Sequence, residues 1–302
     1  MRGPGLPNLD QLIVFLSVVE TGSFAAAGRQ LGRATSAISY TIANLELQLG
    51  VSLFDRDRTR KPTLTREGTA ILSEAHNVRD GVANLRAKVK GLLDGLEAEV
   101  ALVVDVMMPT TRLVDAMQAF DTTFPTVTLR LHVEALGAVI QLVHSGVAHI
   151  GICEPRHGSL SGLERIKVGG VELIPVAAPS HPLAIGSALA PGDARKHTQL
   201  VLTDRSPLTE GRDFGVIGTR SWRLADLGAK HALLLAGIGW GNMPEPIVRG
   251  DLAAGRLKRL DVPDSTGGFY SLEAIYRTDR PPGPAAAWMI QRFSNQADNV
   301  EI

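Results

Sequence analysis

Glycines at two points divide the first fifty residues of this chain into three short helices. Apolar residues recur at helical spacing across residues 9–53, which is typical of amphipathic helices. Gly22 permits a left-handed exit from the first helix, and Ser23 can cap the second by accepting hydrogen bonds from its free amides. Gly32 supplies a tight turn after the alanine-rich second helix, and a third helix opens three or four residues later. This order and spacing predict a helix-turn-helix.

The third helix is expected to expose a polar face. If its apolar residues face inward, its hydroxyl and amide side chains face outward near its start. These side chains, with the arginine just before the helix, belong to Arg33, Thr35, Ser36, Ser39, Tyr40, Thr41 and Asn44. Such groups can donate to or accept from base edges in a DNA major groove, which is wide enough to admit a helix. Taken alone, the same pattern also fits a solvated helix face.

A cluster of cations follows the third helix. Its members are Arg56, Arg58, Arg60 and Lys61. On a hairpin-like wing these side chains could straddle the phosphates that flank a DNA site, although a charged loop is the alternative. Residues 1–66 hold eight Lys and Arg against five Asp and Glu, an excess that the rest of the chain cancels to a net charge of zero. Because basic segments attract phosphate backbones, the polar helix and the cationic wing together predict binding to double-stranded DNA.

A long amphipathic segment at 65–96 is predicted to pair two copies of the chain. Its apolar residues are spaced alternately four and three positions apart, at Ile71, Ala75, Val78, Val82, Leu85, Val89, Leu92 and Leu96. This heptad seam predicts packing against another helix along most of its length. Because the sequence contains no equally long partner helix, we expect self-pairing into a homodimer. The alternative is a long helix that packs on its own chain.

From residue 97 onward, predicted strands and helices alternate. The strands are expected at 98–106, 126–133, 148–153, 171–178, 200–203, 214–217 and 269–277. The helices are expected at 110–120, 136–144, 224–236 and 285–293, with a turn-rich stretch at 237–244. Such alternation predicts α/β units with parallel strands. The predicted fold class is therefore α/β with an all-α-rich head.

Three stretches of the head form an ordered motif: "FLSVVETGSFAAAGRQLG", "SAISYTIANLELQLGVSLFDR" and "LTREG". In this order they resemble the winged helix-turn-helix of the LysR-type transcriptional regulators. Four later stretches resemble landmarks of that family's effector domain: "FPTVTLRLHV", "LVHSGVAHIGICEP", "VELIPVAAPSHPLA" and "LLLAGIGWGNMPEPIVRGDLAAGRLKRL". That domain is similar to periplasmic binding proteins, in which a ligand cleft lies between two α/β lobes.

The resemblance implies three parts of the chain. They are a winged helix-turn-helix at 1–66, a dimerising linker helix at 67–96 and an effector-binding domain at 97–302. Within the last, lobe one is expected at 97–161 and 268–302, and lobe two at 162–267. The chain would then be a homodimer or homotetramer that regulates transcription under the control of a small organic effector.

The expected effector site lies between the lobes. Its first-lobe residues follow the first strand, where backbone amides at a helix start could meet an anion, and they are Met107, Met108, Pro109 and Thr110. By analogy with the family, the second lobe would contribute Thr203, Trp222, Gly239 and Trp240. Methionine and tryptophan suit an apolar or aromatic ligand that carries a polar group. Core packing is the alternative for the two methionines.

Other chemical signals in the sequence are weak. The glycines of "AGIGWGN" follow a predicted helix and so indicate a bend rather than a nucleotide-binding loop. The eight histidines show no HExxH motif and no Cys/His ligand spacing, so we expect no metal. The lone cysteine, Cys153, excludes an internal disulfide and suits a buried, unreactive position. Because no nucleophile signature such as GxSxG is present, we expect neither catalysis nor a cofactor.

The sequence also bears on location. No segment approaches the roughly 20 uncharged apolar residues that cross a bilayer, and the start of the chain lacks the apolar run of a signal peptide. We therefore expect a cytoplasmic protein with no membrane partner. The main interpretation is an effector-controlled, DNA-binding regulator. The alternative is a cytoplasmic solute-binding protein whose head serves assembly rather than DNA binding.

Overall fold

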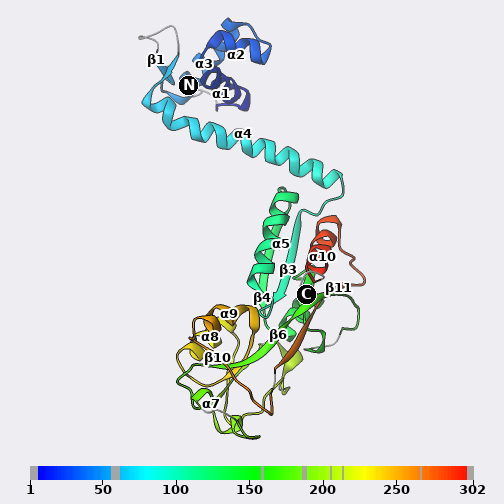
Figure 1. The fold of residues 1–302 in the computed structure, drawn as a ribbon. Coiled ribbons are helices and arrows are strands. Elements are labelled where there is room, and N and C mark those ends of the chain that lie inside the picture. Colours follow the sequence, from blue (N-terminus) through cyan, green and yellow to red (C-terminus); the bar gives the residue numbers. More distant parts are fainter. Residues whose placement is uncertain are drawn as a thin grey trace. The chain divides into compact units, whose positions relative to one another are not determined.

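The computed structural model describes residues 6–55, 62–157, 160–185, 189–204, 206–212, 214–265 and 267–297. The chain divides into two compact units, Met1–Lys90 and Gly91–Ile302. The first unit holds three short helices and most of a long one, and the second is an α/β domain of two lobes (Figure 1). The predicted fold class is confirmed.

Three short helices open the first unit, which we call the head. They are α1 Leu9–Thr21, α2 Phe24–Leu31 and α3 Thr35–Leu49. Gly22 and Gly32 each adopt a left-handed φ of 66° at the ends of α1 and α2. Ser23 accepts a hydrogen bond from the Ala26 amide at the start of α2. The predicted helix-turn-helix is therefore confirmed, together with its glycine turns.

A short hairpin packs on these helices. Its strands, which pair antiparallel, are β1 Phe54–Asp55 and β2 Thr63–Leu64. The Phe54 ring lies edge-on to Phe15 and Phe24, with ring centroids 5.6 and 5.5 Å apart. Glu46 on α3 accepts hydrogen bonds from the amides of Leu53 and Phe54. These contacts fix the base of the hairpin against the apolar core of the head.

The turn between α2 and α3 depends on a close backbone contact at Gly28. The Arg33 amide donates to the Gly28 carbonyl at 2.8 Å. A Cβ atom on Gly28 would lie 2.7 Å from the Arg33 carbonyl oxygen, closer than Cβ atoms approach such an atom. Any larger residue at this position would therefore push the start of α3 away from α2.

The long helix α4, Arg66–Leu93, confirms the predicted long helix but divides its apolar seam. Ile71 and Ala75 pack in the core of the head. Leu96 lies beyond the helix and packs against the core of the second unit. The exposed seam residues, which we call the α4 stripe, are Val78, Leu85, Val89 and Leu92, with 46%, 62%, 48% and 49% of their surface accessible. This stripe is shorter than the seam that the spacing predicts.

The first lobe of the second unit contains a mixed sheet in the order β4-β3-β5-β11-β6 (Figure 1). Its strands are β3 Glu99–Asp105, β4 Thr128–Glu134, β5 Ile150–Cys153, β6 Leu163–Ala177 and β11 Gly268–Arg277. β3 is parallel to β4 and to β5, as the alternation of strands and helices predicted. β11 runs antiparallel to both β5 and β6.

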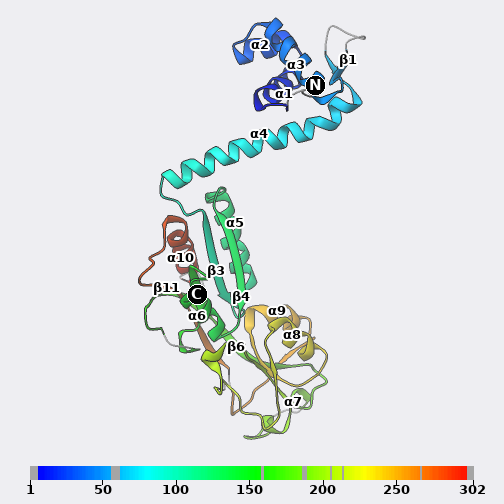
Figure 2. The ribbon, with the colours of Figure 1, turned by 180° about the vertical axis from the view of Figure 1, so that it is seen from behind.

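Helices cover both faces of this sheet. They are α5 Thr110–Thr123, α6 Gly137–His144 and α10 Pro284–Ala297. Leu102 and Val104 of β3 share an apolar cluster with residues of α5 and α10. Val103 faces the other way and packs with α6, which comes to the front in Figure 2. Because side chains alternate along a strand, β3 lies at the centre of a three-layer lobe.

The second lobe forms around the far half of β6. Its other strands are β7 Gln199–Leu202, β8 Ser221–Leu224, β9 Gly241–Pro244 and β10 Lys258–Arg259. Its helices are α7 Pro182–Ile185, α8 Leu227–Leu235 and α9 Glu245–Ala253. Single turns of 3₁₀ helix occur at η1 Pro155–His157, η2 Ala194–Lys196 and η3 Pro207–Thr209. β9 and β10 pair with the end of β6, which therefore joins the two lobes.

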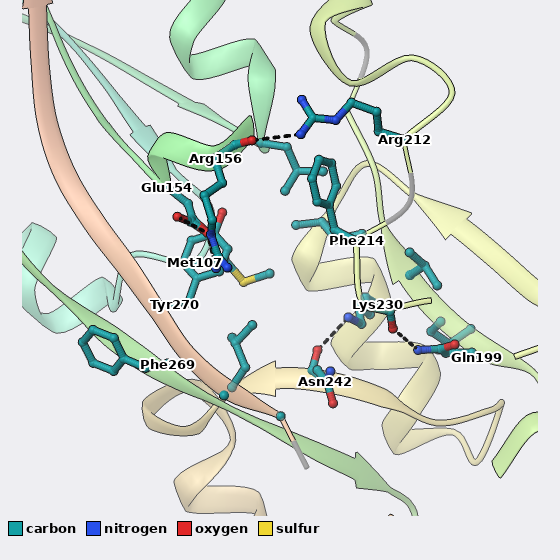
Figure 3. Close-up of a pocket in the computed structure, with 18 residues that line it drawn as sticks. Met107, Glu154, Arg156, Gln199, Arg212, Phe214, Lys230, Asn242, Phe269 and Tyr270 are labelled. Carbon is teal, nitrogen blue, oxygen red and sulfur yellow. Dashed lines mark hydrogen bonds and ion pairs between the residues drawn. The ribbon is translucent and has the colours of Figure 1, made fainter. Parts of the chain in front are cut away.

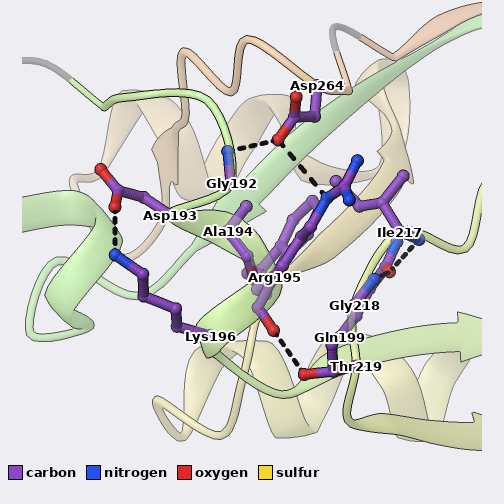
Figure 4. Close-up of polar contacts among 11 residues, drawn as sticks. Gly192, Asp193, Ala194, Arg195, Lys196, Gln199, Ile217, Gly218, Thr219 and Asp264 are labelled. Carbon is purple, nitrogen blue, oxygen red and sulfur yellow. Dashed lines mark hydrogen bonds and ion pairs between the residues drawn. The ribbon is translucent and has the colours of Figure 1, made fainter.

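The predicted strand at 214–217 does not form. The backbone groups of this segment form hydrogen bonds with a side chain rather than with a neighbouring strand. Gln199 accepts hydrogen bonds from the amides of Ile217 and Gly218, both at 2.9 Å (Figure 4), and donates to the Gly215 carbonyl at 2.8 Å. The buried amide of Gln199 thus holds this segment as a loop.

Other boundaries also differ from the sequence prediction, and strand β6 begins at Leu163 rather than at 171. Helix α8 starts at Leu227 rather than at 224, because Leu224 ends β8 and the Asp226 side chain caps the helix. The stretch at 237–244, predicted as turns, ends in strand β9. Strand β8 and helix α9 were not predicted.

Replacing Gly28 with alanine should destabilise the head, because the new Cβ would press on the Arg33 carbonyl oxygen. We expect a loss of roughly 1–3 kcal/mol in the free energy of unfolding, measured by denaturant titration of the full chain with circular dichroism. Gly81→Ala on α4 is the control, because open space surrounds that position and alanine there should add up to about 1 kcal/mol. Equal effects at the two positions would contradict the close contact at Gly28.

Candidate functional site

Helix α3 exposes polar side chains on the face predicted to read DNA. Its buried residues are Ile38, Ile42 and Leu45. Its exposed polar residues are Thr35, Ser36, Ser39 and Tyr40. The ring of Tyr40 projects furthest, with 70% of its surface accessible. Thr41 and Asn44 are half-buried, and the Thr41 hydroxyl donates to the Ala37 carbonyl of its own helix at 2.9 Å.

Arg33 has a partner that the sequence did not reveal. Its guanidinium donates two hydrogen bonds, each of 2.7 Å, to the Asp10 carboxylate in the first turn of α1. These hydrogen bonds hold the pKa of Asp10 below its ordinary value. A DNA contact by Arg33 would have to compete with this pair, which is solvent-exposed and therefore weak.

The cationic cluster predicted as a wing lies outside the described residues. Its members are Arg56, Arg58, Arg60 and Lys61. The structure describes the strands on either side, where Asp55 pairs with Thr63 and Phe54 with Leu64. The cations therefore belong to the connection between two antiparallel strands that are fixed on the core of the head.

The second unit contains a cavity of about 450 Å³ between its lobes (Figure 3). This volume suits a small organic molecule. Its charged side chains are Glu154, Arg156, Arg212 and Lys230. Other polar side chains at its wall are Gln199, Asn242 and Tyr270. Apolar side chains at its wall include Met107, Leu136, Leu173, Leu202, Phe214 and Phe269.

A buried carboxylate organises the first-lobe wall of this cavity. Asp105, at the end of β3, accepts hydrogen bonds from the amides of Met107 and Leu136 at 2.9 and 3.3 Å. It also accepts a hydrogen bond from the Tyr270 hydroxyl at 2.8 Å. Burial raises the pKa of Asp105 to about 6. Leu136 has a left-handed φ of 51°, a strain of about 1–3 kcal/mol for a non-glycine residue, and its hydrogen bond to Asp105 helps to hold it.

An ion pair and a stacked arginine form another part of the wall. Arg156 Nη2 lies 2.7 Å from a carboxylate oxygen of Glu154, whose side chain is 2% exposed. From the second lobe, Arg212 donates to the Arg156 carbonyl at 3.1 Å (Figure 3). The Arg212 guanidinium also lies 5.1 Å from the centroid of the Phe214 ring. Arg212 therefore links the two lobes beside the cavity.

Lys230 of α8 faces these groups from the second lobe (Figure 3). The residue is 3% exposed, and its Nζ donates to the Asn242 carbonyl at 2.7 Å. No carboxylate in the described part of the chain pairs with this ammonium group. Burial lowers the pKa of Lys230 to about 8. The side-chain oxygen of Asn242 is also buried and has no hydrogen-bond partner among the described residues.

Of the eight predicted effector-binding residues, all in the described part of the chain, Met107 alone lines this cavity. Met108 packs in the apolar core. The structure places the others as follows: Pro109 and Thr110 at the start of α5, Thr203 in a neighbouring polar hollow, and Trp222 half-exposed on β8.

Gly239 and Trp240 serve packing in the second lobe. Gly239 has a φ of 74°, and a Cβ there would lie 2.5 Å from the Thr198 carbonyl oxygen. Trp240 is fully buried, and its indole N–H donates to the Ala194 carbonyl at 3.1 Å. Its ring packs in an apolar cluster with Leu183 and Leu260. Trp240 was expected to face a ligand, but in the structure it is part of an apolar core.

Sequence reasoning missed the charged side chains of the cavity. One signal could have found Lys230, because it shares a helical stripe with Leu227 and Leu234, three and four positions away. A lysine on the apolar stripe of a helix is expected to be buried. Glu154, Arg156 and Arg212 carry no comparable signal, because isolated charges near strand ends and in loops are common on protein surfaces.

Two family models match the chain. One, described as a bacterial regulatory helix-turn-helix protein of the lysR family, matches residues 9–69. The other, described as the LysR substrate binding domain, matches residues 94–298. The chain belongs to the LysR family. It is a DNA-binding transcriptional regulator controlled by a small-molecule effector, as the resemblance predicted.

Named regulators are similar to this LysR-family chain over nearly all of its length. AceR of Acinetobacter baumannii is 27% identical over 291 residues, which span 96% of this chain and 97% of AceR. YhaJ of Escherichia coli is 29% identical over 296 residues, which span 95% of each protein. The activator AllS of Klebsiella pneumoniae is 29% identical over 82% of this chain and 93% of its own.

Solved structures show the same fold. Full-length LysG from Corynebacterium glutamicum, with bound effector arginine, has a TM-score of 0.51 and 20% identity, covering 97% of this chain and 99% of LysG. Oxidized OxyR from the same organism has a TM-score of 0.52 and 20% identity, covering 98% of this chain and 93% of OxyR.

Three other features complete the description of this LysR-family chain. Within the described residues, no helix has the length and apolar character to span a membrane. The same residues contain no group of three or more His, Cys, Asp or Glu side chains arranged to hold a metal ion. Cys153 is fully buried, and burial raises the pKa of its thiol well above the ordinary value.

Replacing Lys230 with methionine should stabilise the protein at pH 7, because the folded state then no longer buries an unpaired ammonium. The pKa of Lys230 falls from 10.5 to about 8 on folding, so the gain is at most on the order of 3 kcal/mol. As the pH rises, Lys230 of the folded wild type loses its proton at a lower pH than Lys230 of the unfolded chain does. Wild-type stability should therefore rise from about pH 8 to 10.5 relative to that of Lys230→Met.

Denaturant titrations at several pH values measure both effects. The exposed Lys258 of β10 supplies the control, since Lys258→Met should change stability little at any pH. A Lys230→Met protein less stable than wild type, with no difference in pH dependence, would contradict the burial of an unpaired cation.

Proposed function

We propose that α3 reads DNA bases, that the cations of segment 56–61 contact phosphates, and that an effector in the lobe cavity controls both. The proposed division is a winged helix-turn-helix at 1–66, a linker helix at 67–96 and an effector domain at 97–302. The effector domain would act by binding rather than by catalysis. This role places the protein in the cytoplasm, where bacterial DNA lies.

The polar face of α3 carries the DNA part of this proposal. Its residues Ser36, Ser39 and Tyr40 are exposed on a helix whose other face is fixed in the core. Hydroxyl groups held on a rigid helix can discriminate base edges. The neighbouring cations would add affinity without sequence preference, because phosphates are the same at every base pair.

Contacts between the lobes support control by a ligand. From the second lobe, Asp204 accepts a hydrogen bond from the Ala138 amide of α6 at 2.8 Å, and Arg212 donates to the Arg156 carbonyl. A molecule between the lobes would favour the lobe arrangement that fits it best. LysG, which has the same fold, has been solved with an effector bound.

The α4 stripe supports self-association. Val78, Leu85, Val89 and Leu92 are spaced as on one face of a paired helix. Exposed apolar residues in such a row are stabilised when a second helix covers them. We propose that two copies pair along this stripe and so hold two heads for adjacent half-sites of DNA.

Ser36→Ala should reduce affinity for the specific DNA site by roughly 1–3 kcal/mol if its hydroxyl contacts a base. Affinity for unrelated DNA should stay within about a factor of two of wild type, since phosphate contacts dominate nonspecific binding. The measurement is fluorescence anisotropy with a duplex selected from a random library by the wild-type protein.

Ser73→Ala is the control for this experiment, because Ser73 is an exposed serine on α4, outside the proposed DNA face. Tyr40→Phe extends the test by removing one hydroxyl and keeping the exposed ring. If all three variants discriminate the selected duplex as well as wild type does, another surface of the head reads the bases.

Leu85→Asp should weaken the dimer, because pairing along the α4 stripe would bury two carboxylates against each other. Analytical ultracentrifugation over a concentration series measures the dissociation constant, which should rise by about tenfold or more. Asn84→Asp adds the same charge at an adjacent exposed position off the stripe and should leave the dimer unchanged. An unchanged dimer for Leu85→Asp would assign pairing to the effector domain.

A further inference from the structure

The ammonium group of Lys230 has unused hydrogen-bonding capacity. A lysine ammonium carries three N–H donors, and one of them binds the Asn242 carbonyl. No other acceptor for this group lies among the described residues. The cavity wall thus includes a buried cation whose remaining donors the described residues leave unused.

The other charges of the cavity do not compensate Lys230. The single carboxylate among its described lining residues, Glu154, is held by Arg156 through both the Nε and Nη2 atoms. Arg212 adds a further positive charge at the wall. Among the described lining residues, three cationic side chains and one carboxylate leave an excess of positive charge.

An unpaired buried cation is costly for the folded state. Burying a charge without a partner opposes folding, and a hydrophobic residue of similar size in its place is often more stable. A buried anion beside Lys230 would remove that cost, because a charge-assisted hydrogen bond is strong where water is excluded. No described group of the chain supplies this partner, so an anionic ligand is a candidate for it.

Apolar side chains define the rest of the ligand. Phe214 and Leu202 come from the second lobe, and Met107 and Leu136 come from the first. A cavity of about 450 Å³ is within the range that holds small organic ligands, and a substituted aromatic ring fits inside it. A flat apolar body against these side chains would leave its charged end free to reach Lys230.

We propose that the effector of this protein is a small organic anion whose negative group binds Lys230 Nζ and whose apolar body lies between the lobes. The inference rests on the proposed function only in naming this ligand an effector, since the binding itself needs no DNA.

Matched acids and amides test the charge requirement. Isothermal titration of the full chain at pH 7 would compare benzoate with benzamide and phenylacetate with phenylacetamide, with phenyl phosphate as a second kind of anion. We expect an acid to bind roughly tenfold to a hundredfold more tightly than its amide, as for a charge-assisted hydrogen bond. Tighter binding of phenyl phosphate than of either carboxylate would identify the anion as a phosphate ester.

Lys230→Met should abolish the difference between acid and amide, while Lys258→Met should retain it. Thermal unfolding of both variants checks that they are folded. Amides that bind as tightly as acids, or acids that bind Lys230→Met as tightly as wild type, would overturn the proposal and make Lys230 a structural residue. Wild type that binds none of the three anions would also overturn it.

Failure of the anion proposal can be distinguished from failure of the proposed DNA-binding function. A neutral effector that controls operator binding would end the anion proposal and leave the regulatory function intact. Anion binding by a protein that discriminates no DNA sequence would do the reverse.

Discussion

The pairing of β6 with β11 is the interaction on which the second unit depends. β6 pairs with β11 from Leu163 to Leu173 and then continues to pair with β9 and β10. One strand therefore belongs to the sheets of both lobes. The two lobes are therefore joined through one continuous strand. The cavity lies where this shared strand passes from one lobe to the other, at Leu173 and Tyr270.

The buried charges of the cavity explain how such an arrangement could respond to a ligand. Asp105 is satisfied from within the protein, because three donors from different segments converge on it. Lys230 is not, and it lies in the opposite lobe. One lobe thus has a completed polar network and the other an incomplete one. A ligand that completes the second network also contacts the first lobe, so its binding energy depends on how the lobes are arranged.

Much of the fold could be predicted from the sequence because its signals are local. Gly22 and Gly32 mark helix ends through their own backbone freedom, and the three helices that they separate occur in the predicted order. Strands β3 and β5 were predicted because they are continuous apolar runs, whereas the first-lobe half of β6 was missed. The prediction of a strand at 214–217 failed for the opposite reason, because the side chain of Gln199, distant in sequence, decides the structure of this segment.

The same distinction separates the two candidate sites. The face of α3 could be predicted because helical periodicity alone decides which residues point outward. The effector cavity depends on contacts between segments far apart in sequence, such as Arg156 with Arg212. Analogy with the family placed Trp240 at the ligand, but its buried position follows from packing around η2. Lys230 was overlooked although it shares an apolar helical stripe with Leu227 and Leu234.

The most direct test of this account is linkage between the cavity and the DNA. Operator affinity of the full chain would be measured by fluorescence anisotropy as the concentration of a cavity-binding anion is raised, for wild type and for Lys230→Met. The account predicts that the anion changes the operator affinity of wild type by about fivefold or more, and that Lys230→Met binds the operator but does not respond. Saturation of the cavity with no change in wild-type operator binding would contradict it.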